Sequence, residues 1–394
     1  MAPSPAARIP ASADLAGPAA PGAAPPESAA AVSATADSLL AAAAALPRTR
    51  LAVLPTPLVP APRLAEALGV GSLLVKRDDL TGFAFGGNKA RLLEFLVAGA
   101  LADGADTLLT GGAASSNFCA ATAAAARRAG LRCELVIAGH PRRPETGGGL
   151  PGPPGAGPPG AGPAGAGPAD PGPAASGPAG PALALARSWG AAVRWTGTPD
   201  RDSVDAQLPV AAADLAARGR RPYLIPRGGA TGLGAVGYAL AATELREQLA
   251  GHGADRGEVT VAVPTGSGGT LAGLLAGHLL LGRPWALTGC SASRPPQAIV
   301  PRVLSLAGEC LRLLKADQEP SPDDVTVVDA RGPGHGLPSP DGLAAAEQAM
   351  RTEGLMLDPV YTAKALALVP RGRDVVFWHT GGVLDTVAAA EEQP

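Results

Sequence analysis

Residues 85–91 read Phe85-Gly86-Gly87-Asn88-Lys89-Ala90-Arg91, and a helix is predicted to follow them over residues 90–102. The two glycines leave open space in front of Lys89. A lysine amine whose pKa falls through burial or a cationic neighbour becomes a nucleophile that forms a Schiff base with an aldehyde cofactor. An ordinary surface lysine after a flexible turn is the alternative, and it stays open until the surrounding sequence is considered.

The segments around this stretch alternate between predicted strands and predicted helices. Strands are predicted at residues 73–75, 107–110, 131–137, 192–195, 222–226, 259–263, 286–289 and 374–378. An alanine-rich helix is predicted at 118–128 and another helix at 181–189. This alternation predicts an α/β fold with parallel-type sheets covered by helices on both faces.

A second glycine-rich loop, Thr265–Thr270, joins the β-branched strand predicted at 259–263 to an apolar helix. Backbone N–H groups and the helix dipole converge there on an anion. The loop lacks the Lys-Ser/Thr pair of a nucleoside-triphosphate loop. A Schiff-base lysine, an asparagine at a helix start (Asn117) and a phosphate cradle are the three parts that pyridoxal phosphate requires.

Five motifs, taken together, resemble one known family. They are residues 76–89 (KRDDLTGFAFGGNK), Ser116-Asn117, residues 265–270 (TGSGGT), residues 351–366 (RTEGLMLDPVYTAKAL) and residues 379–382 (HTGG). The chain is similar, from about residue 51 to residue 384, to the D-cysteine desulfhydrase and 1-aminocyclopropane-1-carboxylate (ACC) deaminase family. That family belongs to the tryptophan-synthase-β-like class, or fold type II, of pyridoxal-phosphate enzymes.

The resemblance implies two α/β domains with the cofactor in the cleft between them. Residues 103–227 are expected to form the smaller domain, inserted into a larger cofactor-binding domain of residues 48–102 and 228–394. Residues 1–47 consist mainly of Ala, Pro and Ser and are expected to be disordered. Residues 144–180 are rich in Gly and Pro and lack a strict Gly-x-y frame, so a flexible insertion is expected there rather than collagen.

The resemblance also implies roles for individual residues. Lys89 matches the lysine that bonds the cofactor and moves a proton at the substrate carbon. Asn117 matches the asparagine that holds the cofactor ring, and Ser116 matches an active-site serine that contacts the substrate carboxylate or attacks as a nucleophile. Tyr361 matches a tyrosine near the substrate amino group. From the residues alone, helix capping by Ser116 and Asn117 and a buried structural Tyr361 remain open.

The other cofactor contacts implied by the resemblance are Thr265, Gly266, Ser267, Gly268, Gly269 and Thr270 around the phosphate, and Thr380 at the pyridine nitrogen. A neutral hydroxyl at Thr380 leaves that nitrogen unprotonated. The deaminase branch tends to have Glu after the tyrosine of its Asp-Pro-Val-Tyr motif and Leu in the terminal motif. This chain has Thr362 and Thr380 at those places, which favours the desulfhydrase branch.

The chain departs from the family pattern at three places. His335 replaces the tyrosine of a Tyr-Gly-x-Pro motif, Leu92 replaces a phosphate-side lysine, and residues 113–118 replace the usual Val-Gln-Ser-Asn-His. An imidazole at His335 is a candidate acid or base, and an exposed loop histidine is the alternative. These changes leave most of the cofactor frame in place and alter the substrate wall.

Residues 232–237 match the dinucleotide pattern Gly-x-Gly-x-x-Gly and raise the possibility of a nicotinamide enzyme. In the true fingerprint the glycines follow a strand directly. Here the loop 227–231 separates them from the predicted strand, and the match coincides with a glycine-rich segment of the resembled family. The nicotinamide interpretation is therefore not favoured.

Charge and composition limit the partners that we expect. A net charge of -2 gives no basic footprint for nucleic acid or an anionic membrane surface. The four cysteines show neither Cys-x-x-Cys metal spacing nor a secreted disulfide framework, so we expect no metal site and a cytoplasmic location. There is no run of about twenty apolar residues for a membrane helix.

These features predict a pyridoxal-phosphate-dependent carbon-sulfur lyase or deaminase that acts on a small amino acid. The resemblance implies α,β-elimination from D-cysteine, which gives pyruvate, ammonia and sulfide, and it implies a homodimer. ACC deaminase is one alternative. A cofactor-binding homologue with a different substrate or no turnover is another.

Overall fold

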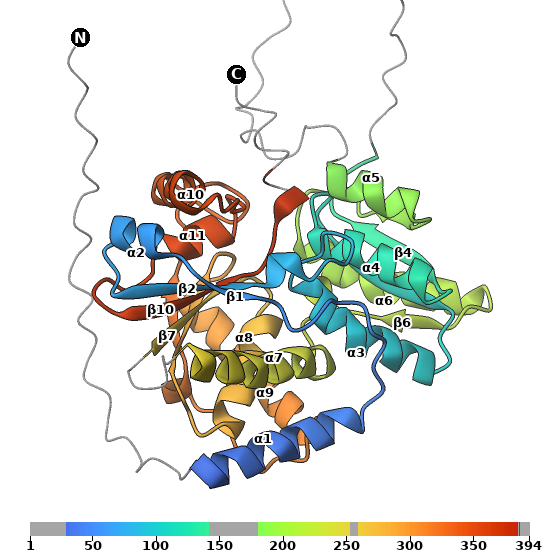
Figure 1. Ribbon diagram of the computed structural model, residues 1–394. Coiled ribbons are helices and arrows are strands. Elements are labelled where there is room, and N and C mark those ends of the chain that lie inside the picture. Colours follow the sequence, from blue (N-terminus) through green and yellow to red (C-terminus); the bar gives the residue numbers. More distant parts are fainter. Residues whose placement is uncertain (1–28, 142–179, 253–258, 385, 387–394) are drawn as a thin grey trace, which may run out of the picture.

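The computed structural model describes residues 29–141, 180–252, 259–384 and 386 (Figure 1). The strands are β1 (Leu58–Pro60), β2 (Ser72–Arg77), β3 (Thr107–Gly112), β4 (Arg132–Ile137), β5 (Ala192–Trp195), β6 (Pro222–Leu224), β7 (Val259–Thr265), β8 (Ala286–Ser291), β9 (Thr326–Asp329) and β10 (Asp374–His379). The α-helices are α1 (Ala29–Ala44), α2 (Pro62–Leu68), α3 (Lys89–Ala102), α4 (Asn117–Arg128), α5 (Pro181–Ser188), α6 (Asp202–Ala217), α7 (Gly232–Gly251), α8 (Gly269–Leu280), α9 (Pro296–Leu313), α10 (Pro340–Glu353) and α11 (Thr362–Leu366).

The strands form two sheets. One has six strands in the order β1-β2-β10-β7-β8-β9, and the other has four in the order β5-β4-β3-β6. Every neighbouring pair is parallel except β1 with β2. All seven residues of β7 are buried, as expected for a central strand covered on both faces. The predicted α/β fold with parallel-type sheets is confirmed.

All four strands of the smaller sheet lie between residues 107 and 224, and the six strands of the larger sheet lie before and after that range. Figure 1 shows the two groups as separate parts of the molecule. Helix α3 packs against α4 on one side and α7 on the other, so it joins the parts. This arrangement supports the division into a small inserted domain and a larger one, which remains a proposal.

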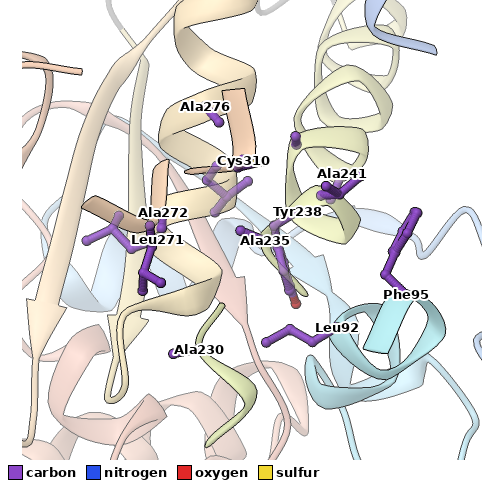
Figure 2. Packing of buried hydrophobic residues seen from close by; sticks show 14 of the residues in the cluster. Leu92, Phe95, Ala230, Ala235, Tyr238, Ala241, Leu271, Ala272, Ala276 and Cys310 are labelled. Atoms are coloured by element: carbon purple, nitrogen blue, oxygen red, sulfur yellow. The ribbon is translucent and has the colours of Figure 1, made fainter. Parts of the chain in front are cut away.

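Close helix packing explains the glycines of the dinucleotide-like pattern. A Cβ atom on Gly237 would lie 2.3 Å from the Arg91 carbonyl oxygen of α3, and one on Gly232 would lie 2.4 Å from Cβ of Glu309 on α9. Helices α7 and α8 also meet through small residues, as Figure 2 shows for Ala235 and Ala272. The pattern therefore serves helix-helix contact in this fold.

Helix α1 corrects the expectation that residues 1–47 are disordered. Residues 29–44 are helical, and Leu39 and Ala43 are buried in the main hydrophobic cluster. The helix packs against α7 and α8. Alanine has the highest helix propensity, and burial of Leu39 and Ala43 on one face adds the tertiary packing that stabilises a helix in a protein. The remainder of the predicted disordered segment, residues 1–28, lies outside the described residues.

The eight strands predicted from the sequence are all present, with ends that differ by two residues or fewer. The predictions missed β1 and β9, which are short edge strands. The predicted flexible insertion at 144–180 lies, except for its last residue, outside the described residues. No helix within the described part of the chain has the length and apolar character needed to cross a membrane.

Candidate active site

A cavity of about 480 Å³ opens between the two sheets. Its lining includes the loops that follow the carboxyl ends of β3, β7 and β10, and it also includes Lys89 at the start of α3. In parallel α/β sheets, ligands bind at the carboxyl ends of the strands. The fold therefore brings three glycine-containing motifs, residues 85–91, 265–270 and 379–382, to the wall of one cavity.

Lys89 is the first residue of α3 and lines the cavity. Burial lowers the pKa of its amine from 10.5 to about 8, although the charge of Asp358 opposes that shift. A substantial fraction of the amine is therefore neutral at mildly alkaline pH. This is the state in which a lysine acts as a nucleophile or base.

The turn before Lys89 depends on Gly87. Its φ is +53°, and a Cβ atom there would lie 2.2 Å from the carbonyl oxygen of Thr380. The next residue, Asn88, donates its N–H to that same carbonyl at 2.9 Å and its side-chain amide to Thr270 Oγ1 at 2.9 Å. The turn thus ties the lysine to both the terminal motif, residues 379–382, and the glycine-rich loop, residues 265–270.

Gly87→Ala is expected to destabilise the protein by about 3 kcal/mol, because it combines left-handed backbone strain with a clash against backbone atoms. Gly130→Ala is the matched control, since Gly130 has φ +72° and a methyl group added there would have no neighbouring atom within 4 Å. That control should cost about 1 kcal/mol. Urea denaturation measures both values, and equal losses would show that the close approach to Thr380 does not constrain the turn.

A buried charge network surrounds Arg91, which follows Lys89 by two residues on α3. The guanidinium of Arg91 donates to both carboxylate oxygens of Asp78, at 2.8 and 3.0 Å, and to Glu244 at 2.9 Å. Tyr238 and Trp378 also donate to Asp78. Burial by itself would raise the pKa of Asp78, but the charge of Arg91 and these hydrogen bonds hold it below its ordinary value. The network fixes α3 against α7 and β10.

The glycine-rich loop of residues 265–270, predicted to bind a phosphate, connects β7 to α8. Its N-cap residue, Gly268, has φ +95° and contributes no side chain to the helix end. A Cβ atom on Gly266 would lie 3.0 Å from the ring of Tyr361. The loop is therefore an open cradle at the positive end of a twelve-residue helix, which suits a phosphate group.

Five of the six predicted loop residues line the cavity: Thr265, Gly266, Ser267, Gly268 and Thr270. Gly269 does not. Its Cβ position lies 3.2 Å from Cα of Ala230, so a side chain there would press on the neighbouring backbone. Close packing against Ala230 therefore explains why residue 269 is a glycine. Its contribution to cofactor binding stays a prediction.

Ser116 and Asn117 lie side by side at the start of α4, and both line the cavity. Ser116 is the N-cap of the helix, and its Oγ accepts a hydrogen bond from the Cys119 N–H at 3.3 Å. A Cβ atom on Gly112 would come within 3.0 Å of that Oγ. Capping by Ser116 is thus real, and it holds the hydroxyl at the wall of the cavity.

Asp358 is a cavity residue that the sequence reasoning missed, although it stands in the Asp-Pro-Val-Tyr motif. It is 2% exposed, and its Oδ1 accepts the N–H groups of Val360 and Tyr361 at 3.0 and 2.7 Å. Its Oδ2 accepts the Thr362 N–H at 2.9 Å. The carboxylate orders the chain around Tyr361, and its charge acts on Lys89.

His335 and Tyr361 form a pair at the cavity wall. The Nε2 atom of His335 is 3.1 Å from the hydroxyl of Tyr361, and both residues line the cavity. The histidine is half-buried rather than exposed. Burial lowers its pKa from 6.5 to about 4, and the charges of Arg201 and Lys364 act in the same direction. The imidazole is therefore neutral at physiological pH.

We expect the imidazole of His335 to stay unprotonated until the pH falls close to 4. A folded-state pKa below the unfolded value means that the neutral histidine contributes stability above pH 6.5, and that this contribution declines as the pH falls toward 4. Its ring-proton chemical shifts, assigned by comparison with His335→Phe, measure the pKa. A midpoint near 6.5 would contradict the expectation.

Four arginines also line the cavity and were missed by sequence reasoning: Arg201, Arg227, Arg294 and Arg302. They come from separate segments and share no motif. Among the residues that the structure describes, no group of three or more His, Cys, Asp and Glu side chains is arranged to hold a metal ion.

The donor set of the cavity fits pyridoxal phosphate. Lys89 offers an amine of lowered pKa, and the start of α8 offers backbone N–H groups with no side chain in front of them. Thr380, which is 9% exposed, offers a neutral hydroxyl, and Asn117 offers an amide. These groups match an aldehyde, a phosphate, a pyridine nitrogen and a phenolic oxygen in chemical type.

Comparison with known proteins gives a consistent result. The sequence model of the family described as pyridoxal-phosphate dependent enzyme matches residues 49–381. A D-cysteine desulfhydrase of Salmonella choleraesuis (strain SC-B67) is 36% identical over 349 residues, which cover 85% of this chain and 94% of that protein. A D-cysteine desulfhydrase of Klebsiella pneumoniae (strain 342) is 35% identical over 347 residues, with the same coverage.

Solved structures with the same fold include an ACC deaminase homologue, with a TM-score of 0.72 and 29% identity, covering 90% of this chain and 98% of that one. A threonine deaminase from T.th. gives a TM-score of 0.52 at 21% identity, covering 90% of this chain and 98% of that one. The second likeness shows the fold alone.

Proposed function

Since this chain belongs to the family of pyridoxal-phosphate-dependent enzymes, we propose that it is a lyase that catalyses α,β-elimination from a small amino acid. D-cysteine is the first candidate substrate, and the products are pyruvate, ammonia and sulfide. The observation that carries the proposal is that Lys89, with its lowered pKa, opens on the same cavity as the uncapped start of α8.

When bound, pyridoxal phosphate supplies an electron sink for the negative charge that develops at the substrate Cα. The amine of Lys89 takes the proton from Cα, since its pKa near 8 suits a base at mild pH. Ser116 and the N-terminus of α4 bind the substrate carboxylate. Asn117 and Thr380 hold the cofactor ring, and the loop 265–270 binds its phosphate.

Two positions support elimination over ring-opening. Thr380 lines the cavity and offers a neutral hydroxyl, where the deaminase branch tends to have a leucine with no hydrogen-bonding group. Thr362 is fully buried, and its hydroxyl donates to Asp358 at 2.5 Å, so an acidic side chain there would place a second carboxylate beside that of Asp358. Both are the residues that the resemblance associates with the desulfhydrase branch.

ACC deamination is the second candidate function. Its support is the solved ACC deaminase homologue, which the chain matches over 90% of its length. A homologue that binds the cofactor without turnover, or that acts on a different substrate, is a third candidate, because residues 113–118 and His335 depart from the family pattern.

Turnover assays on the purified holoenzyme distinguish these candidates. D-cysteine, L-cysteine and β-chloroalanine are expected to yield pyruvate, with sulfide from the cysteines, whereas ACC would yield 2-oxobutyrate. Release of 2-oxobutyrate alone would replace elimination by ring-opening. If the cofactor is bound and neither keto acid forms from any of these compounds, the lyase proposal fails.

We also propose that the enzyme is a homodimer and resides in the cytoplasm. Support for the location is that Cys119, Cys133, Cys290 and Cys310 are all buried free thiols. Support for the dimer is the family resemblance. Sedimentation equilibrium of the full chain measures the oligomeric state, and a mass equal to one chain of 38.7 kDa would contradict a dimer.

A further inference from the structure

Four guanidinium groups gather at one side of the cavity, and we refer to Arg201, Arg227, Arg294 and Arg302 as the arginine cluster. They come from the residue before α6, the turn after β6, the loop after β8 and the body of α9. Arg201, Arg227 and Arg294 also line a second hollow of about 420 Å³ that shares this wall. The space beside the cluster therefore continues beyond the main cavity.

The acidic residues nearby neutralise only part of this charge. Arg227 is paired with Asp205 and Asp202. Arg302 donates its Nε–H to the Ser267 carbonyl oxygen at 3.0 Å. Arg201 and Arg294 form no ion pair with any carboxylate in the part of the chain that the structure describes.

Burial makes the positive charge that these carboxylates leave unneutralised energetically unfavourable. It lowers the pKa of Arg201 and Arg302 below the usual arginine value, and the charges of Arg294 and Arg227 act in the same direction. Tyr361 and Asp202 oppose the shift at Arg201, and Asp205 and Glu309 oppose it at Arg302. Guanidinium groups stay protonated in proteins. The repulsion among these buried positive charges is therefore reduced by binding an anion rather than by loss of a proton. The cluster is thus prepared for a negatively charged group.

The cluster lies between His335 and the loop 265–270, because Arg201 and Arg294 act on the charge of His335 and Arg302 contacts Ser267. The charges of Arg201 and Arg294 contribute to the lowered pKa of His335, which is hydrogen-bonded to Tyr361. The two anions that the proposed function already requires have other binding places. The cofactor phosphate is assigned to the start of α8, and the substrate carboxylate to the start of α4. Arg201 and Arg294 are left without an anion.

We propose that the substrates include small amino acids whose β-substituent carries an oxyanion, and that Arg201 and Arg294 bind this second negative charge. The inference rests on the proposed function and names its substrate class. Planar guanidinium groups bind phosphate, sulfonate and carboxylate oxygens in a two-pronged geometry. A β-substituent that leaves as a stable oxyanion is also chemically suited to elimination.

O-phosphoserine is a suitable probe. Loss of the Cα proton accompanies cleavage of the bond from Cβ to the ester oxygen, and the electron pair of that bond leaves with the phosphate. One O-phosphoserine and one water give one pyruvate, one ammonia and one phosphate, with no net oxidation or reduction.

The test compares both enantiomers of O-phosphoserine with O-acetylserine, whose leaving group has no charge until it departs. In the native holoenzyme we expect kcat/KM for O-phosphoserine to exceed that for O-acetylserine by about tenfold or more. In Arg294→Gln and in Arg201→Gln this ratio is expected to fall about tenfold, and Arg201→Lys, which keeps the charge but not the two-pronged geometry, should retain only part of it. Arg312→Gln is the control, because Arg312 is exposed on the same helix as Arg302 and lies outside the cavity.

A ratio near one in the native enzyme, or a ratio that neither glutamine variant changes, overturns the inference. Pyruvate from D-cysteine or O-acetylserine in that case leaves the proposed function standing. Calorimetric dissociation constants for the same two serine esters give a readout that does not depend on turnover. O-phosphoserine that binds no more tightly than O-acetylserine to the native holoenzyme also overturns the inference.

Discussion

Lys89→Ala is expected to lower kcat for pyruvate formation by at least about a thousandfold, because it removes both the covalent anchor of the cofactor and the base at the substrate Cα. Lys89 is the lysine among the described residues that lines the cavity, and burial brings its pKa to about 8. Loss of this side chain leaves the amide of Asn117 and the backbone of α8 to hold the cofactor, so binding weakens but does not vanish. The measurements are the rate of pyruvate release and the absorbance of bound cofactor.

Lys315→Ala is the matched control, since Lys315 is exposed beyond the end of α9 and lies outside the cavity lining. It should keep the native rate and the native spectrum. If Lys89→Ala kept more than a tenth of the native rate, or if mass spectrometry after borohydride reduction placed the cofactor on another lysine, the role assigned to Lys89 would be wrong.

Asp78→Asn is expected to destabilise the protein by about 3 to 5 kcal/mol, the usual consequence of leaving one member of a buried ion pair without its partner. Asp78 is fully buried and accepts from Arg91, Tyr238 and Trp378. The asparagine keeps the shape but loses the charge and one acceptor oxygen. Arg91 would then remain buried with Glu244 as its only carboxylate partner among the described residues. Urea denaturation followed by circular dichroism measures the change.

The pH dependence follows from the lowered pKa of Asp78. A carboxylate whose pKa is lower in the folded state contributes stability that is present above the unfolded value of 3.8 and is lost as the pH falls below it. The native protein should therefore lose stability on acidification more steeply than Asp78→Asn does. Asp329→Asn is the control, because the Asp329–Arg331 pair is about two-fifths exposed and water screens it, so its loss should change stability little. Equal losses in the two variants would refute the role of the buried network.

The strands could be predicted because each is a short segment rich in apolar residues with a glycine or proline at or near one end. The two that were missed, β1 and β9, are three and four residues long and lie at the edges of the larger sheet. Helix α1 was missed for a different reason. An alanine-rich segment has the composition of a disordered tail, and only the burial of Leu39 against the core distinguishes the two.

The residues of the candidate site also divide into those that could be predicted from the sequence and those found only in the structure. Lys89, Ser116, Asn117, the loop 265–270 and Thr380 stand in short motifs, and the fold brings them to one cavity, with Gly269 just outside its lining. Asp358 stood in a motif too, but its importance depends on the distance to Lys89, which sequence spacing does not reveal.

The sequence by itself determined the cofactor frame of this protein. Glycines that permit a close approach, a lysine beside them and a strand followed by a helix start are local patterns, because backbone geometry acts over a few residues. Only the tertiary structure decided the charge on the substrate side. Arg201, Arg227, Arg294 and Arg302 come from four segments, and their combined field depends on their distances in space and on burial, both of which arise only when the chain folds.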